Sequence, residues 1–109
     1  MKFVIISNPR YQPPPEMIVP MIDAFIAYQT KYKESGNILE SWSFAGRVGG
    51  MAVLEVDSHE QLDAIMAENP FGPFSAIEVH PLLDLVESVT IGKQVAQARM
   101  EAMAKMGGG

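Results

Sequence analysis

Short runs of hydrophobic residues, separated by turn-forming residues, are the first clear pattern in this chain. Four of the runs are rich in β-branched and aromatic residues and are bounded by residues that favour turns, which is typical of strands. They lie at residues 3–6, 38–45, 50–56 and 74–82. The segment GRVG at 46–49 joins the second and third runs and predicts a hairpin.

Three further stretches repeat their apolar residues every three or four positions, which predicts helices. They span residues 15 or 20 to 35, 58 to 69 and 91 to 106. The start of the first stays open because both Pro15 and Pro20 suit a first helical turn. Ser58, with Gln61 three residues later, predicts a capping box for the second helix. The glycines at 107–109 predict a frayed end.

The order of these elements is strand, helix, strand, strand, helix, strand, followed by one more helix. This order predicts an α+β fold of the ferredoxin-like type, with two helices on a four-stranded antiparallel sheet. We place this domain at residues 1–85 and a helical tail at 86–109. The tail is rich in methionine, which adapts to irregular surfaces, so we expect it to contact another subunit.

The strands carry apolar residues on both faces. In the first strand, Phe3 and Ile5 point one way while Val4 and Ile6 point the other. Two helices cover only one face, and an antiparallel face in water normally alternates apolar with polar residues. We therefore expect a second copy of the sheet to cover the other face. The result would be a dimeric α/β barrel, present as a homodimer or a larger homo-oligomer.

Composition narrows the class of protein. The 109 residues suit one domain, and the net charge of -5 argues against a nucleic-acid partner, which would need clustered Lys and Arg. The chain has no cysteine, which excludes disulfides, thiolate metal sites and a cysteine nucleophile. The apolar run at residues 3–6 is too short for a signal peptide or a membrane span. We therefore expect a cytoplasmic protein with no membrane partner.

Several motifs resemble the muconolactone isomerase family, within the dimeric α/β-barrel superfamily. The matching stretches together cover residues 1–85 and read PPPEM, SGN, FAG, VLEVDSHEQLDAIM and PFSAIEV. The resemblance implies the ferredoxin-like fold, oligomers built from dimers, and cofactor-free movement of a proton within a small unsaturated lactone. It also implies that the C-terminal segment reaches a neighbouring subunit. The sequence departs from the family at Arg47, which stands where the family has a histidine.

Proton transfer next to a carbonyl needs a base of near-neutral pKa and a donor to the developing oxyanion. His80 suits this task through its ordinary pKa of about 6.5. Glu78 would suit it if burial raised the pKa of its carboxyl group. Both residues are expected on one face of the last strand, and we take them as the candidate catalytic residues. The alternatives are a strand-end histidine bonded to backbone or water, and an edge-strand carboxylate facing water.

Three residues are candidates for substrate binding. Arg47 stays protonated and could hold a carboxylate through two parallel hydrogen bonds. Trp42 and Tyr28 could line a pocket for a flat ring. The alternatives are an exposed hairpin tip for Arg47 and packing in the core for the two aromatic residues. The sequence has no metal-ligand spacing and no glycine-rich phosphate loop before a helix, so we expect neither a metal nor a cofactor.

Three functions stay open on the sequence. The first is a cofactor-free isomerase or lyase-type enzyme that shifts a proton on a small cyclic substrate, such as a lactone or an enol. The second is a non-catalytic oligomer that binds a small molecule or is purely structural, and the departures from the family pattern favour it. The third is a cofactor-free monooxygenase or cyclase of the same superfamily. A cavity between the first helix and the sheet that holds a polar residue of shifted pKa would favour an enzyme.

Overall fold

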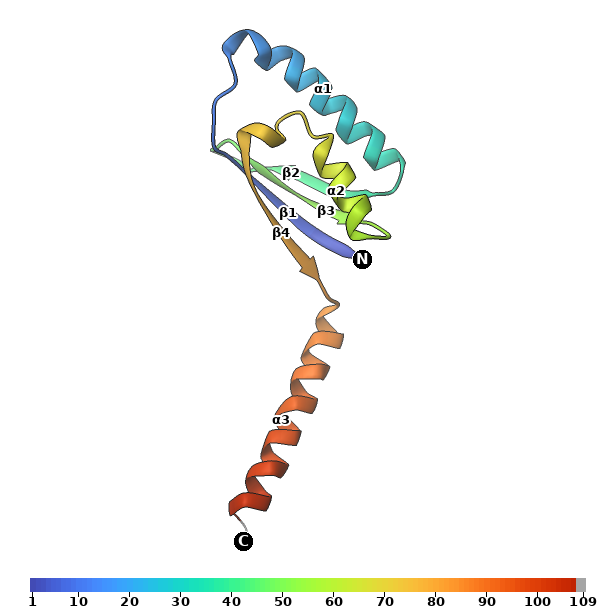
Figure 1. Cartoon of the computed structure of the whole chain (residues 1–109), viewed down its shortest axis with the longest axis vertical. Helices are drawn as coiled ribbons and strands as arrows, with labels where there is room; N and C mark the ends of the chain where they lie inside the picture. The colour runs from blue at the N-terminus through green and yellow to red at the C-terminus, as the bar shows by residue number, and fades with distance from the viewer. Residues whose placement is uncertain (108–109) are drawn as a thin grey trace.

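The computed structural model describes residues 1–107 and has the predicted α+β architecture, with two helices on one face of a four-stranded antiparallel sheet (Figure 1). The elements are β1 Lys2–Pro9, α1 Pro15–Glu34, β2 Ile38–Ser43, β3 Gly50–Glu55, α2 His59–Ala67, a short 3-10 helix at Gly72–Phe74, β4 Ser75–Leu82 and α3 Leu85–Gly107. The ferredoxin-like order β-α-β-β-α-β, followed by a C-terminal helix, is therefore confirmed.

The strands lie in the order β2-β3-β1-β4, and each is antiparallel to its neighbours. β2 and β4 are therefore the two edges of the sheet in one chain. Residues of neighbouring strands lie opposite one another in register, as Ile5 does with Ala52 on β3 and with Val79 on β4. Side chains paired in this way lie on the same face, so the register fixes which of them face the helices.

The hydrophobic core lies between the two helices and the sheet. It consists of the helix-facing apolar residues of the strands together with side chains of both helices, namely Phe3, Ile5, Tyr28, Ile38, Leu54, Val56, Leu62 and Ile65. α1 contributes Tyr28, which lies in the C-terminal half of that helix. The core therefore holds this half of α1 against the sheet.

The ends of the two packed helices follow the signals in the sequence. α1 begins at Pro15, and Pro20 lies inside it. At α2, Ser58 Oγ accepts the N–H of Gln61 at 3.1 Å, and the Gln61 side chain accepts the N–H of Asp57 at 2.7 Å. The predicted capping box is therefore confirmed, with its second bond one residue earlier than in the usual pattern.

β2 contains an irregularity that decides which of its side chains face the helices. Ile38 pairs with Leu54, but Glu40 pairs with the next residue along β3, Val53, so the register shifts between Ile38 and Glu40. A bulge of this kind sets two residues of one strand against one of its partner and turns the strand. After the shift, the odd-numbered residues of β2 share the helix-facing side with Ile38, whereas regular alternation would place the even-numbered ones there.

The sheet face opposite the helices has an apolar centre and is uncovered in one chain. Val4 pairs with Val53, and Ile6 pairs with Met51, in two rows across β1 and β3. These four residues are half-buried although no helix covers them. Trp42 extends the second row to the β2 edge with 52% of its surface exposed. The covering of this face by a second copy stays a prediction, and the Discussion gives its test.

α3 begins earlier than the pattern of apolar residues suggested. We placed its start near Ile91, but it starts at Leu85, because the Asp84 carboxylate accepts the N–H of Glu87 at 3.1 Å and caps the first turn. The helix projects from the body of the molecule with exposed side chains along its length (Figure 1). Its role as a contact between subunits stays a prediction.

Gly107 ends α3, whereas residues 108–109 of the expected frayed end lie outside the described residues. Within residues 1–107, none of the helices combines the length and the apolar character that crossing a membrane requires.

Candidate functional site

A cleft with a volume of ≈ 1110 Å³ lies between α1 and the helix-facing side of the sheet. Ile18, Ile22 and Phe25 of α1 form one wall, and Ala52 lies in the opposite wall. The proline-rich segment at residues 9–13 closes one side. Sites for small molecules usually measure about 300–1000 Å³ and have mainly apolar walls. The cleft therefore has both the room and the lining for a ring-sized organic molecule.

The charged residues that line the cleft are both cations. They are Arg10, which follows β1, and Lys33, in the last turn of α1. The Arg10 guanidinium lies 5.1 Å from the centre of the Tyr11 ring, which also lines the cleft. Because the whole chain carries a net charge of -5, this local excess of positive charge distinguishes the cleft and favours an anionic ligand.

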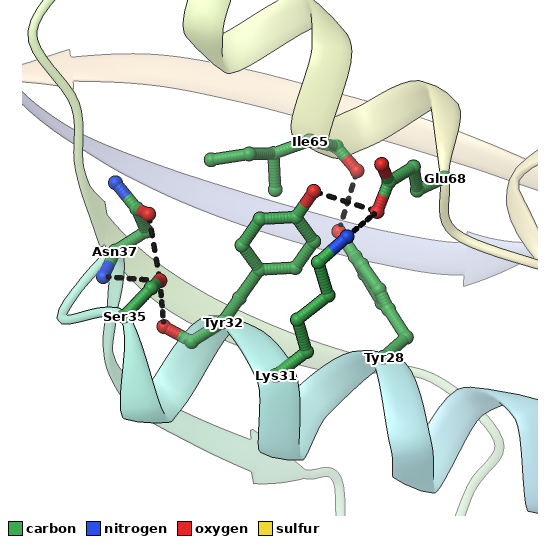
Figure 2. Close-up of polar contacts among 7 residues, drawn as sticks. All are labelled: Tyr28, Lys31, Tyr32, Ser35, Asn37, Ile65 and Glu68. Atoms are coloured by element: carbon green, nitrogen blue, oxygen red, sulfur yellow. Dashed lines mark hydrogen bonds and ion pairs between the residues drawn. The ribbon is translucent and has the colours of Figure 1, made fainter.

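Polar contacts fasten the C-terminal half of α1 to the end of α2 (Figure 2). The Tyr28 hydroxyl donates to the Ile65 carbonyl at 2.8 Å, and the Tyr32 hydroxyl donates to the Glu68 carboxylate at 2.6 Å. Lys31 Nζ donates to the same carboxylate oxygen at 3.0 Å. The hydrogen bonds from Tyr32 and then Lys31 lower the pKa of Glu68. These contacts position α1 above the sheet and so help to define the cleft.

Tyr28, a predicted substrate-binding residue, is buried and lines the cleft. Burial raises the pKa of its phenol to about 12, and the charges of Tyr32 and Glu68 act in the same direction. The phenol is therefore neutral at physiological pH, and it serves as a hydrogen-bond donor to Ile65 and not as a general base. A direct contact between Tyr28 and a ligand stays a prediction.

We expect ionisation of Tyr28 to destabilise the protein at high pH. The folded-state pKa of about 12 lies above the ordinary value of 10.0, so the contribution of Tyr28 to stability is present below pH 10 and is lost as the pH rises to 12. The free energy of unfolding, measured by chemical denaturation over this range, should fall more steeply in the wild type than in Tyr28→Phe. Equal slopes would contradict a buried, hydrogen-bonded phenol.

Gln29 is a candidate that the sequence reasoning missed. It lines the cleft, and its side-chain oxygen is buried with no hydrogen-bond partner among the described residues. A buried acceptor without a donor costs about 1–3 kcal/mol. The signal in the sequence was a polar residue within the apolar stripe of the first helix, between Phe25 and Tyr32. Gln29 is therefore a candidate to accept a hydrogen bond from a ligand in the cleft.

Arg47 lies at the tip of the β2–β3 hairpin, where the sequence placed it. Its Nη1 donates to Asn8 Oδ1 at 2.9 Å and to the Val48 carbonyl at 3.2 Å. Its guanidinium stacks over the Phe44 ring, 4.1 Å from the ring centre. Val48 and Gly49 line the cleft, so Arg47 is held beside its mouth. Arg47 therefore lies at an exposed hairpin tip and is also close enough to the cleft to contact a ligand. Its clamping role stays a prediction.

The candidate catalytic residues lie on the other face of the sheet from the cleft. His80 pairs with Val4 and Glu78 pairs with Ile6, so both side chains project from β4 on the uncovered face, where both are exposed. Trp42 lies on that face by its register and also borders the cleft from the β2 edge. The structure thus brings His80 and Glu78 together but separates both from the cleft by the thickness of the sheet.

The lining of the cleft is poor in side chains that could act as an acid or a base. Among the described residues, those that line the cleft include tyrosines, serines and amides. These described residues include neither a carboxylate nor an imidazole. Over the part of the chain that the structure describes, His, Asp and Glu side chains form no group of three that could hold a metal ion. The described cleft is therefore equipped to hold a ligand, whereas groups suited to proton transfer lie on the uncovered face.

Two solved enzymes share this fold. Muconolactone isomerase has a TM-score of 0.67 at 22% sequence identity, and the match covers 75% of this chain and 88% of the isomerase chain. The 5-chloro-2-hydroxyhydroquinone dehydrochlorinase TftG from Burkholderia phenoliruptrix AC1100, in complex with 2,5-dihydroxybenzoquinone, has a TM-score of 0.56 at 18% identity. This second match covers 76% of this chain and 94% of the dehydrochlorinase chain. At these identities the likeness concerns the fold, and it confirms the expected relationship to the fold of muconolactone isomerase.

Comparison of the sequence with known protein families identifies the family of the chain. No curated protein matches the chain. The profile of a family described as a domain of unknown function (DUF3303) matches residues 1–96, which include the whole sheet, both packed helices and the first half of α3. The chain therefore belongs to the DUF3303 family.

Proposed function

We propose that the cleft between α1 and the sheet binds a small, ring-containing organic anion. The observation that carries this proposal is the combination of apolar walls with two cationic lining residues, Arg10 and Lys33, in a protein of net charge -5. The apolar walls would bury the ring, and the cations would attract a carboxylate or an enolate. Arg47, held beside the mouth, could add a third cation.

Binding can be tested with two probes that share a ring and differ in charge. Benzoate and its neutral isostere benzamide are titrated into the full chain, and binding is followed by protein NMR. We expect benzoate to bind more tightly than benzamide, and the double variant Arg10→Gln/Lys33→Gln to lose about fivefold in benzoate affinity, on the order of 1 kcal/mol.

The matched control for this titration is Lys93→Gln/Arg99→Gln, because Lys93 and Arg99 both lie on α3 with exposed side chains. Like the test variant, it removes two positive charges from the protein, but neither residue lines the cleft. Equal affinities of benzoate and benzamide in the wild type, or unchanged benzoate affinity in the double variant, would contradict an anion site in the cleft.

We also propose that the sheet face opposite the cleft carries a second site, at which the protein shifts a proton on a small lactone or enol without a cofactor, as an isomerase or lyase-type enzyme, with Glu78 and His80 as acid and base. The observation that favours this second function is their position, two residues apart on one face of β4. A second copy of the sheet over that face would remove both groups from water. The base would take a proton from a carbon next to a carbonyl, and a proton would return at another carbon.

Exchange of carbon-bound protons for solvent deuterium tests this reaction. Small unsaturated lactone acids are incubated with the protein in heavy water, and their proton signals are followed by NMR. We expect exchange with the wild type and its loss in both Glu78→Gln and His80→Ala. Glu40→Gln is the matched control, because Glu40 lies on the same face at the other edge of the sheet. Retained exchange in both variants would contradict the assignment of these residues, and probe binding without exchange would leave a binding protein.

A further inference from the structure

The floor of the cleft contains three serines that the register of the sheet brings together. Ser7 on β1 and Ser43 on β2 both pair with Gly50 of β3, so the three residues form one row. In the next row, Ser41 on β2 pairs with Ala52 of β3. All five residues line the cleft. The floor therefore has hydroxyl groups on β2 and β1 and very small residues on β3, which lies between these two strands.

This arrangement depends on the bulge in β2. The register shift between Ile38 and Glu40 turns the odd-numbered residues Ser41 and Ser43 toward α1, and it places Trp42 in a row on the other face. Bulges beside binding sites often re-aim side chains in this way. Without the shift, Trp42 and Glu40 would face the cleft, and a bulky ring and a negative charge would stand where the hydroxyl groups now lie.

The hydroxyl groups of the three serines are free to bind a ligand. Other serines of the chain are committed to the fold, since Ser35 Oγ donates to the Tyr32 carbonyl and Ser75 Oγ donates to the Phe71 carbonyl. Across residues 1–107, the side chains of Ser7, Ser41 and Ser43 make no hydrogen bond to another protein group. A hydroxyl in a mainly apolar cleft gains most from a partner that the ligand brings.

The width of the gap between the serines indicates what the ligand looks like. Neighbouring strands lie about 4.8 Å apart, so the Cβ atoms of Ser7 and Ser43, two strands apart, are separated by roughly 10 Å. Gly50 places no side chain between them, and a Cβ at that position would clash with the Trp42 carbonyl oxygen. A gap of this width has room for one flat six-membered ring that carries an oxygen substituent at each end.

We propose that Ser7, Ser41 and Ser43 recognise the ring oxygens of the bound anion, so that the ligand is a hydroxylated or oxo-substituted ring acid and not a bare one. The inference rests on the proposed binding function of the cleft and specifies its ligand. Each serine hydroxyl can both donate and accept a hydrogen bond, which suits a phenol, an enol or a ring carbonyl. The small residues of β3 allow the ring to lie flat on the sheet.

The test compares ring acids that differ in one oxygen substituent. Benzoate and 4-hydroxybenzoate are titrated into the full chain, and transfer of magnetisation from the ring protons to the Ala52 methyl group reports whether the ring lies on the floor. We expect 4-hydroxybenzoate to bind about three- to tenfold more tightly than benzoate, as one or two hydrogen bonds would give. In Ser41→Ala/Ser43→Ala this gain should disappear, while benzoate affinity stays within about twofold.

Ser88→Ala is the matched control, since Ser88 lies on the exposed helix α3 and its replacement should leave the gain intact. Unchanged benzoate binding also shows that the double serine variant is folded. Benzoate binding with no gain from the hydroxyl group, or with a gain that survives in the double variant, would overturn the serine floor but leave the anion site standing. Failure of benzoate itself to bind would overturn the proposed function and this inference together.

Discussion

Replacing Val53 by lysine is expected to prevent the predicted pairing of two sheets and to leave a monomer of 11.9 kDa. Val53 lies on the uncovered sheet face, opposite Val4 on β1 and Glu40 on β2. In a single chain the new ammonium group would lie beside the Glu40 carboxylate, so the fold should tolerate it. Between two stacked sheets the same charge would lose its water, which costs several kcal/mol for each ion.

Light scattering during size-exclusion chromatography measures this effect. At micromolar concentration the wild type should have about twice the mass of one chain, or a larger even multiple of it, and Val53→Lys should have the mass of one. Val48→Lys is the matched control because Val48 lies on the hairpin with 74% of its surface exposed. It should keep the wild-type mass. A folded, monomeric wild type would show that no second copy covers this face, and would leave Glu78 and His80 in water.

Most of the fold could be predicted because each element carries its own local signal. α1 begins at Pro15, one of the two starts that the sequence left open, and Ser58 with Gln61 caps α2 as the sequence indicated. The start of α3 was missed although Asp84 and Glu87 have the same three-residue spacing. The apolar periodicity of that helix is weak, because the α3 side chains described are exposed along its length and its apolar residues are not confined to one stripe.

The site could be predicted only in part, because its geometry depends on the pairing between strands. Regular alternation along residues 38–45 places Trp42 on the same face as Ile38, and the bulge in β2 reverses this. A bulge arises from the fit of one strand against its neighbour, so residues 38–45 alone do not reveal it. The serines of the floor were overlooked for the same reason, since strand positions two apart look equivalent until the register is known.

The sequence located the candidate catalytic residues and the candidate substrate-binding Arg47 within their elements, but it did not show which of them share a site. Alternation along β4 correctly placed Glu78 and His80 on one face, because that strand is regular. It could not say which face the helices cover, since this follows from the handedness and packing of the whole domain. Arg47 was placed correctly at the hairpin tip, but its hydrogen bond to Asn8 joins residues far apart in the chain. Local patterns therefore gave positions within elements, and tertiary pairing decided which of them share a site.

Gly49 lies at the mouth of the cleft, and its replacement by alanine is expected to destabilise the protein strongly. Gly49 has a φ of +120°, and a Cβ there would lie 2.7 Å from the backbone oxygen of Ser7. The same Cβ would lie 3.3 Å from Arg47 Nη1 and 3.3 Å from Phe44 Cδ2. Backbone strain and the contact with β1 together should lower the free energy of unfolding by roughly 3 kcal/mol or more. The Arg47 guanidinium and the Phe44 ring would have to shift by a few tenths of an ångström.

Gly46→Ala in the same hairpin separates the two causes. Gly46 has a φ of +82°, but a Cβ there would meet nothing within 4 Å, so only the backbone conformation opposes the change. It should cost about 1–2 kcal/mol. Chemical denaturation of both variants gives a difference that reports the contact between Gly49 and β1. Equal losses would mean that the hairpin does not pack against Ser7 as the structure has it, and Arg47 would lose its fixed position. Benzoate affinity gives a second measurement on the same two variants. A loss of affinity in Gly49→Ala but not in Gly46→Ala would indicate that the Arg47 guanidinium belongs to the anion site.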